Sequence, residues 1–220
     1  MSSSPVNNFS ITIATVNGSG SQTANNTVLR AIHTMGLPVS GKNIFPSNIQ
    51  GLPTWFTIRV NRDGHLARSG NYQVLVAMNK ASFKEDLEQL APGGICLYPD
   101  DQQLPLKRDD ITCYPMPVTE LVKQSGVDIK LKPYVANIVY VGELAWLLGI
   151  EMQEIEAALA HTLGGKQKAI SLNGATITAA YDWAAANLTK TDPFRLERMD
   201  KTSGTFLIDG NSAAALGAIF

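Results

Sequence analysis

Apolar and polar residues follow two different spacings along this chain of 220 residues. In the first half, short apolar runs rich in β-branched residues end at glycine, proline or asparagine, which is typical of β-strands. The run 54–61 alternates strictly, so that Phe56, Ile58 and Val60 share one face of the predicted strand. Strands are predicted at 11–16, 39–45, 54–61, 72–78, 95–98 and 111–114.

Between and after these strands, apolar residues recur at the spacing of one buried helix face. The second predicted helix is expected to begin with a capping box, Ser82-Phe-Lys-Glu85, and to be ended by Pro92-Gly-Gly94. A short strand at 205–208 and an alanine-rich helix follow near the end of the chain. The other helices are predicted at 24–35, 137–148, 151–163 and 173–188.

This order of elements predicts an α/β fold, with a Rossmann-like, mostly parallel sheet, flanking helices and a helical C-terminal part. Residues 1–188 form the main domain, and residues 189–203 have the charged composition of a linker. Residues 204–220 begin a further domain that is truncated here, because an apolar helix of this kind is expected to bury itself against a partner. We infer that the chain is a piece of a longer polypeptide.

Composition narrows the class of protein. A hydrophobic fraction of 45% and a charged fraction of 17% fit a soluble globular protein, and a net charge of −1 gives no steering towards nucleic acid or membrane. No apolar run reaches the ~20 residues of a membrane span, and the first residues lack the features of a signal peptide. We therefore expect a cytoplasmic location.

Cys96 and Cys113 are the only two cysteines of the chain. Both lie in apolar, strand-like stretches, so we expect two buried free thiols, and the alternative is a disulfide between them, which a cytoplasmic protein does not need. An iron–sulfur cluster takes about four cysteines, and this chain alone is therefore not expected to hold one.

The strongest candidate for ligand binding is the small, polar segment between the first predicted strand and helix, Gly18-Ser-Gly-Ser-Gln-Thr23. Glycines let the backbone turn tightly and approach a ligand, and the free N–H groups at a helix start favour an anion. The candidate contacts are Gly18, Gly20, Ser21, Gln22 and Thr23. The match to a dinucleotide-binding turn is partial, since Thr23 stands at the third glycine position. The alternative is a tight turn with no ligand.

Charge indicates which ligand this turn suits. A NAD site uses an Asp or Glu about 20 residues further on, but the first acidic residue of this chain is Asp63. Arg30, Lys42, Arg59 and Arg62 precede it. This balance disfavours NAD and favours a ligand that carries phosphates, and we expect Lys42 and Arg59 to reinforce the turn.

The loop 45–53 joins two predicted strands and is rich in polar amides and turn-forming residues. Loops at the carboxyl ends of strands are where open α/β sheets bind ligands. We expect Ser47, Asn48, Gln50 and Gly51 to form one anion-binding mouth with the glycine turn. The alternative is an ordinary connecting turn.

The remaining polar residues show no spacing typical of a catalytic or metal site. His33, His65 and His161 lie apart, without a cysteine or carboxylate at a metal-ligand spacing. The glutamates of the predicted helix 151–163 are expected on its solvated face. The sequence therefore predicts no catalytic residue and no metal ligand in this chain.

Several separated motifs resemble the gamma module of 2-oxoacid:ferredoxin oxidoreductases. In many members of that family the turn reads G-x-G-G-Q-G, and Ser21 and Thr23 stand here in place of two glycines. The segment Asp209-Gly-Asn-Ser-Ala-Ala-Ala-Leu-Gly217 resembles the opening of the alpha module that follows gamma in fused subunits. The gamma-like motifs are Asn17-Gly-Ser-Gly-Ser-Gln22, Val39-Ser-Gly-Lys-Asn43, Phe45-Pro-Ser-Asn-Ile-Gln-Gly-Leu-Pro-Thr-Trp55, Ile58-Arg-Val60, Val76-Ala-Met-Asn79 and Leu90-Ala-Pro-Gly-Gly94.

The family decarboxylates a 2-oxoacid on thiamine diphosphate, passes electrons through iron–sulfur clusters to ferredoxin, and transfers the acyl group to coenzyme A. The resemblance implies that this chain packs on the alpha and beta modules of such an enzyme and helps to cover coenzyme A. It is most similar to the 2-oxoglutarate enzymes. Thiamine diphosphate, its Mg²⁺ and the iron–sulfur cluster are implied to lie in other modules, so we expect this chain alone to be catalytically silent.

Two alternatives stay open. The first is an independent nucleotide-binding dehydrogenase, against which the missing acidic residue after the second strand argues. The second is a purely structural docking module whose glycine turn is empty.

Overall fold

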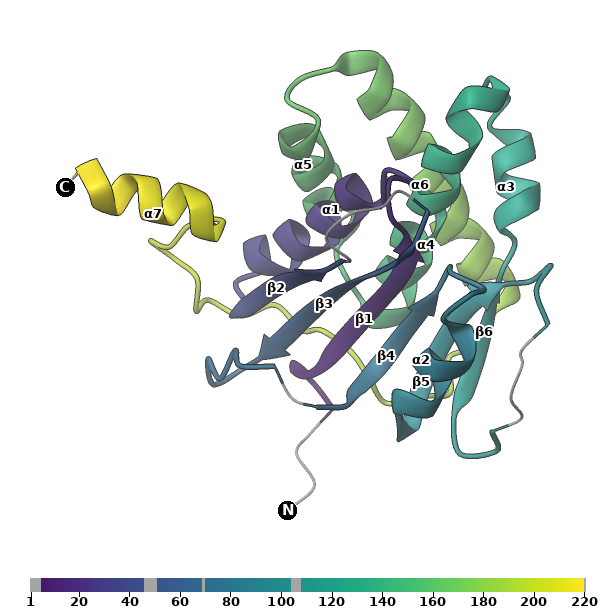
Figure 1. The fold of residues 1–220 in the computed structure, drawn as a ribbon, viewed down its shortest axis with the longest axis horizontal. Coiled ribbons are helices and arrows are strands. Elements are labelled where there is room, and N and C mark those ends of the chain that lie inside the picture. Colours follow the sequence, from purple (N-terminus) through teal and green to yellow (C-terminus); the bar gives the residue numbers. More distant parts are fainter. Residues whose placement is uncertain (1–4, 46–50, 69, 104–107, 220) are drawn as a thin grey trace.

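The computed structural model describes residues 5–45, 51–68, 70–103 and 108–219. A six-stranded sheet lies at its centre, in the order β2-β3-β1-β4-β5-β6 (Figure 1). The strands are β1 (Asn8–Val16), β2 (Val39–Ile44), β3 (Pro53–Asn61), β4 (Tyr72–Ala77), β5 (Leu90–Pro99) and β6 (Thr112–Met116). The helices are α1 (Ser21–Thr34), α2 (Phe83–Gln89), α3 (Val118–Gln124), the short 3-10 helix η1 (Ile129–Leu131), α4 (Lys132–Leu148), α5 (Met152–Thr162), α6 (Gln167–Asn187) and α7 (Gly210–Ile219).

The sheet is mixed but mostly parallel, as the sequence predicts. Strands β1, β4, β5 and β6 pair in parallel, whereas β3 lies antiparallel between β1 and β2. Strand β4 is apolar along most of its length because both of its faces are covered. The predicted α/β fold class is therefore confirmed.

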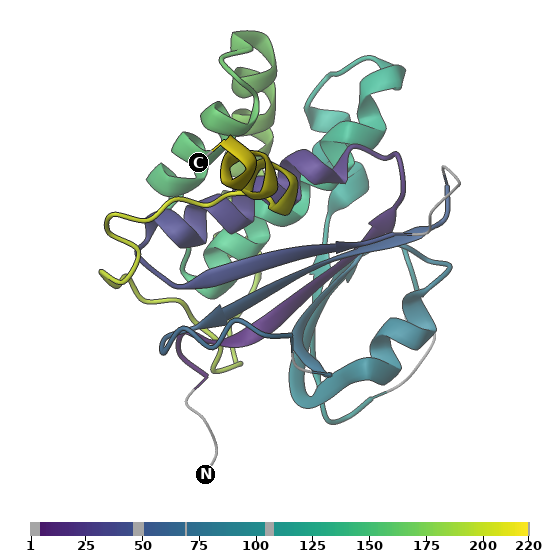
Figure 2. The same cartoon turned by 60° about the vertical axis from the view of Figure 1, so that its left-hand side comes forward.

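The two faces of the sheet are covered unequally. Phe9, Ile11 and Ile13 of β1 belong to the larger core, which includes residues of α1, α4, α5 and α6. Ala14 belongs to a smaller core with Phe83 and Leu87 of α2. Figure 2 shows the helix-rich layer on one side of the sheet and α2 on the other. Helix α4 is apolar around most of its circumference, since it packs against α1, α3 and α6.

Several element boundaries differ from the predicted ones. Helix α4 begins at Lys132 rather than at residue 137. The ring of Pro133 in its first turn fixes the φ angle near the helical value, which favours a helix start there. Helix α6 begins at Gln167 rather than at residue 173. Helices α3 and η1 were not predicted, since each is shorter than the window over which helical spacing can be recognised.

Three local predictions are wrong. Ser82 does not form a capping box: its hydroxyl donates to Asp86 Oδ2 at 2.7 Å, and the Ser82 backbone is already helical. Pro92-Gly-Gly94 does not separate α2 from the next strand, because β5 already begins at Leu90. Residues 205–208 form no strand, and no strand pairing connects them to the sheet.

The predicted linker crosses the amino-terminal edge of the sheet, and we call residues 189–205 the strap. Arg195 forms a β-bridge with Val6. Further along, the Leu196 N–H donates to the Leu148 carbonyl at 2.7 Å, and the Met199 N–H to the Met35 carbonyl at 2.9 Å. The strap therefore lies fixed against β1, α4 and α1 over most of its length.

Helix α7 follows the strap and stands apart from the other helices (Figure 1). None of its residues is buried, and Leu216 and Ile219 are exposed apolar side chains. Within the described part of the chain, no helix combines the length and the apolar character that crossing a membrane requires.

Candidate functional site

Strand β1 leads directly into the glycine turn, at the carboxyl edge of the sheet. Gly18 and Gly20 have φ angles of 83° and 81°, in the left-handed region that side chains disfavour. The Ser19 N–H donates to the Val16 carbonyl at 3.1 Å and closes the turn. The two glycines thus allow the chain to reverse between the last residue of β1 and the start of α1.

The start of α1 is open to an anion. Gly20 occupies the N-cap position, no side chain caps the helix, and its first turn holds no acidic residue. The unpaired N–H groups and the helix dipole there favour negative charge by ~0.3–1 kcal/mol. The Ser21 side chain is fixed by β1, because Thr15 Oγ1 donates to Ser21 Oγ at 2.9 Å.

Helix α4 holds the turn from the side. Asn137 Nδ2 donates to the Ser19 carbonyl at 2.9 Å, and the Tyr140 hydroxyl donates to Asn25 Oδ1 at 2.7 Å. The ring of Tyr134 lies over Gly20, so closely that a Cβ atom on this glycine would overlap the ring. Sequence reasoning missed these three residues of α4, although Pro133 could have signalled a helix start that includes Tyr134.

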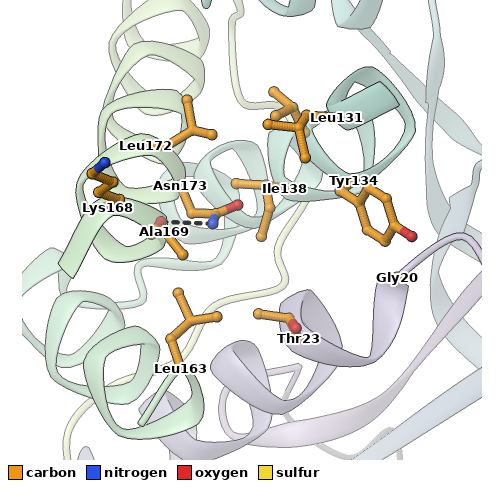
Figure 3. Close-up of a pocket in the computed structure, with 11 residues that line it drawn as sticks. Gly20, Thr23, Leu131, Tyr134, Ile138, Leu163, Lys168, Ala169, Leu172 and Asn173 are labelled. Atoms are coloured by element: carbon orange, nitrogen blue, oxygen red, sulfur yellow. Dashed lines mark hydrogen bonds between the residues drawn. The ribbon is translucent and has the colours of Figure 1, made fainter. Parts of the chain in front are cut away.

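A cavity of about 380 Å³ opens beside the turn (Figure 3). Its walls are mostly apolar, and Lys168 at the start of α6 is the one charged residue among those that line it. The Asn173 amide in the wall donates to the Ala169 carbonyl at 2.7 Å. The lining residues are Gly20, Thr23, Leu131, Tyr134, Val135, Ile138, Leu163, Lys168, Ala169, Leu172 and Asn173.

This cavity suits an elongated ligand with an apolar part and an anionic part. The apolar part would contact the leucine and isoleucine walls, and the anionic part would lie near Lys168 and the open start of α1. No acidic side chain is among the lining residues to oppose it.

The structure brings some of the predicted site residues together. The Gly51 N–H donates to the Asn17 carbonyl at 3.0 Å, so the end of the loop 45–53 meets the glycine turn. Gln22 accepts a hydrogen bond from Asn43 Nδ2 at 2.5 Å, which ties α1 to β2. Ser47, Asn48 and Gln50 lie outside the described residues.

Lys42 and Arg59 do not lie at the turn. Lys42 is paired in register with Thr57, and Arg59 with Ser10 near the start of β1. Both side chains lie on the face of the sheet opposite α1, because their neighbours Phe56 and Ile58 fill the face that α1 covers. The expectation that these two cations reinforce the turn is therefore corrected.

The other ionisable groups that the structure describes lie apart from the turn. In the described ranges of the chain, no three His, Cys, Asp or Glu side chains group as metal ligands would. Cys96 and Cys113 are free thiols, Cys113 only half-buried, and burial raises the pKa of both. Burial, reinforced by the charge of Asp100, raises the pKa of Glu143 in α4 to about 9.

Comparison with known proteins identifies a family that the chain matches. Residues 10–183 match the family described as pyruvate ferredoxin/flavodoxin oxidoreductase. Subunit alpha of 2-oxoacid:ferredoxin oxidoreductase 2 from Aeropyrum pernix is 22% identical over 253 residues, which cover 96% of this chain and 39% of the relative. The chain spans about two fifths or less of the length of the curated relatives it matches.

Two solved structures share the fold. The 2-oxoglutarate:ferredoxin oxidoreductase from Magnetococcus marinus, with 2-oxoglutarate, coenzyme A and succinyl-CoA bound, matches 97% of this chain and 37% of its own, with a TM-score of 0.83 and 22% identity. The gamma subunit of a keto/oxoacid ferredoxin oxidoreductase from Geobacter sulfurreducens matches 81% of this chain and 99% of its own, with a TM-score of 0.65 and 16% identity.

Proposed function

The chain belongs to the family of pyruvate ferredoxin/flavodoxin oxidoreductases, and from this premise we propose that it is the gamma-type module of a 2-oxoacid:ferredoxin oxidoreductase that helps to cover coenzyme A. The enzyme would oxidatively decarboxylate a 2-oxoacid, for which 2-oxoglutarate is the best candidate, to its acyl-CoA and reduce ferredoxin. The Magnetococcus enzyme, which matches nearly the whole chain, supports this substrate and this ligand.

One observation carries the proposal. The uncapped, acid-free start of α1 opens onto a mostly apolar cavity with Lys168 in its lining. Coenzyme A combines phosphates with a long, thin pantetheine arm, so its phosphates suit the helix start and Lys168, and its arm suits the apolar walls. The role of this chain would be to bind and orient the acyl acceptor.

The rest of the chemistry would belong to partner modules. We propose that residues 189–203 connect this module to an alpha module that begins at residues 204–220, and that a beta module completes the enzyme. The exposed apolar residues of α7 support this division, as does the greater share of the chain matched by the longer Magnetococcus protein than by the Geobacter gamma subunit. Thiamine diphosphate with its Mg²⁺ would supply decarboxylation there, and iron–sulfur clusters the electron transfer.

The test is Lys168→Gln in the enzyme assembled with its partner subunits. Loss of one cation beside a phosphate removes ~1 kcal/mol of attraction, so the KM for coenzyme A should rise about three- to tenfold. Decarboxylation of the 2-oxoacid, followed without coenzyme A, should keep its rate because the variant leaves the decarboxylating site untouched.

The matched control is Lys166→Gln, two residues earlier, whose side chain is exposed and does not line the cavity. An unchanged KM in Lys168→Gln, or an equal rise in Lys166→Gln, would contradict the contact with coenzyme A. In that case the docking module without a ligand would be the better description. Saturable binding of NAD to the glycine turn would instead favour the dehydrogenase alternative.

A further inference from the structure

The face of the sheet opposite α1 carries a second concave site. Two adjoining cavities, of about 200 Å³ and 270 Å³, share Thr57 and Arg68 in their linings. The first is bounded by Trp55 and Tyr72, and the second extends over β2 and β3 to Arg59. We call this pair of cavities the β3 site.

Three cations line the β3 site, Lys42 from β2, Arg59 from β3 and Arg68 from the following loop. Arg59 donates one hydrogen bond, to Asn8 Oδ1 at 2.6 Å, and burial lowers its pKa. Among the described residues, none of the three forms an ion pair. Their positive charge is therefore not compensated within this part of the protein.

A carboxylate does lie in the lining, but its oxygens are occupied. Asp86 accepts from Trp55 Nε1 at 2.7 Å through Oδ1 and from the Ser82 hydroxyl at 2.7 Å through Oδ2. Burial raises the pKa of this carboxyl. Asp86 thus positions Trp55 at one end of the site and does not neutralise the cations at the other.

Two hydroxyl groups of the lining are available to a ligand. Thr12 and Thr57, opposite each other on β1 and β3, are only 4% and 7% exposed and line the site. In the described part of the chain, neither hydroxyl forms a hydrogen bond, whereas Thr15 Oγ1 donates to Ser21 Oγ and Thr54 Oγ1 donates to the Ile44 carbonyl. Both hydroxyl oxygens remain accessible at the surface of the cavity, so each is free to donate a hydrogen bond to a ligand there.

We propose that the β3 site binds a small phosphorylated molecule. Its phosphate would lie among Lys42, Arg59 and Arg68 and accept a hydrogen bond from Thr57. Arginine forks bind phosphate oxygens in pairs, and three converging cations match a group that carries more than one negative charge. The remainder of the molecule would extend towards Trp55, which offers an apolar face.

This site is separate from the glycine turn. Thr57 is in register with Thr12, which precedes the end of β1 at Val16 by four residues, or about 13 Å along the strand. The two sites also lie on opposite faces of the sheet, since the turn leads into α1. The proposal therefore does not depend on the contact with coenzyme A, and different substitutions test each.

Calorimetric titration of the 220-residue chain with pyrophosphate tests the proposal. We expect saturable binding of one pyrophosphate, weakened at least tenfold by Arg68→Gln, whose side chain is exposed and forms no hydrogen bond or ion pair among the described residues. Thr57→Val should weaken binding severalfold with little change of volume. The matched control is Arg62→Gln, an exposed arginine near the same loop that does not line the site, for which less than a twofold change is expected.

Titrations with other ligands identify the class of molecule that the site binds. Tighter binding of ADP than of pyrophosphate would support a nucleotide that reaches Trp55, and equal binding would support a phosphate site without a base contact.

Absence of saturable binding would overturn the proposal, as would equal losses in Arg62→Gln and Arg68→Gln. Tighter binding of citrate than of pyrophosphate would overturn the phosphate assignment. Loss of pyrophosphate binding in Lys168→Gln, but not in Arg68→Gln, would place the anion at the glycine turn instead.

Discussion

The two ends of helix α1 carry glycines with nearly the same backbone conformation. Gly20 before the helix has φ 81°, and Gly36 after it has φ 80°. At both positions an added Cβ atom would overlap a neighbour, but the neighbours differ. At Gly20 it is the side chain of Tyr134, which is 52% exposed, and at Gly36 it is the backbone carbonyl of Met199 in the strap.

This difference separates the edge where we propose ligand binding from the edge that the strap closes. At the carboxyl edge, α1 is uncapped and the buried Ser19 hydroxyl has no partner among the described residues. At the amino-terminal edge, the strap satisfies the groups that the helices and strands leave open, and buried Asp192 accepts from both Tyr114 and Lys190. Polar groups are thus left available on the side where a ligand is proposed and paired on the other.

Gly36→Ala should have the largest effect. A non-glycine residue in the left-handed region is disfavoured by ~1–2 kcal/mol, and the overlap with Met199 would break the strap's hydrogen bonds to Met35 and Gly36, at ~1 kcal/mol each. We expect a loss of about 3–4 kcal/mol and a Tm lower by about 10 °C. Hydrogen exchange should show faster exchange at the Met199 and Lys201 amides. Unchanged protection there would mean that the strap does not depend on this approach.

Glu143→Gln should show the next largest effect, through pH. Glu143 lies in α4 between the two edges, fully buried, with neither oxygen hydrogen-bonded among the described residues. Its pKa of about 9 means that the folded protein keeps it protonated, while the unfolded chain releases the proton above pH ~4.5. Stability is therefore lost as the pH rises from ~4.5 towards 9.

The neutral Gln variant lacks this loss. The difference in the free energy of unfolding, variant minus parent, should therefore increase by about 2–3 kcal/mol between pH 6 and pH 8, at ~1.4 kcal/mol per pH unit. Denaturant unfolding at several pH values measures this difference. The matched control is Glu156→Gln on α5, the same substitution at an exposed helix position. A difference that stays constant with pH in Glu143→Gln would show that the carboxyl is ionised in the folded protein.

Gly20→Ala should have a smaller effect than Gly36→Ala, although the backbone strain is the same. Tyr134 can rotate towards solvent, so only the ~1–2 kcal/mol of left-handed strain should be lost. Adding Tyr134→Ala tests this in a double-mutant cycle, for which we expect a coupling free energy below ~0.5 kcal/mol. If Gly20→Ala were as destabilising as Gly36→Ala, the distinction between the two ends of α1 would fail.

Arg198→Gln should have the smallest effect. Arg198 links the strap to α5 through Glu151 and Glu154, and its hydrogen bond to Glu151, together with its charge, lowers the pKa of that carboxyl. Arg198 and Glu151 are well exposed and Glu154 only partly covered, so the ion pairs add little, and the Tm should fall by no more than about 2 °C. High salt should remove most of that difference. A fall as large as that of Gly36→Ala would show that ion pairs, rather than backbone contacts, hold the strap.

The sequence predicted the features that depend on local pattern. Alternation in β3 and the apolar run of β4 identified the sheet, and the two glycines identified the turn. The alternation that placed Phe56 and Ile58 on one face also implied that Arg59 lies on the other, but charge alone had grouped Arg59 with the turn. Neighbouring charges in a sequence do not show which face of a sheet they share.

Other features depend on contacts between distant segments. Asn137 and Tyr140 reach the turn from α4, more than a hundred residues further along the chain, and no local pattern signals such a contact. The strap has the charged composition of a linker, yet many of its contacts are made by its backbone, which any sequence offers, and Phe194 and Leu196 are buried in the larger core. Gly36 and Met199 are close only because the chain returns to the end of α1.

The strap also has a mechanical consequence. Tension applied to the chain beyond Thr205 would first load the hydrogen bonds of Thr205 and Thr202 to His33, and then those that join Lys201 to Gly36 and Met199 to Met35. Those bonds sit at one end of α1, a stiff rod of fourteen residues that extends about 21 Å to the glycine turn. A pull on the C-terminal segment is thus transmitted along a rigid strut to Gly20, at the opposite edge of the sheet.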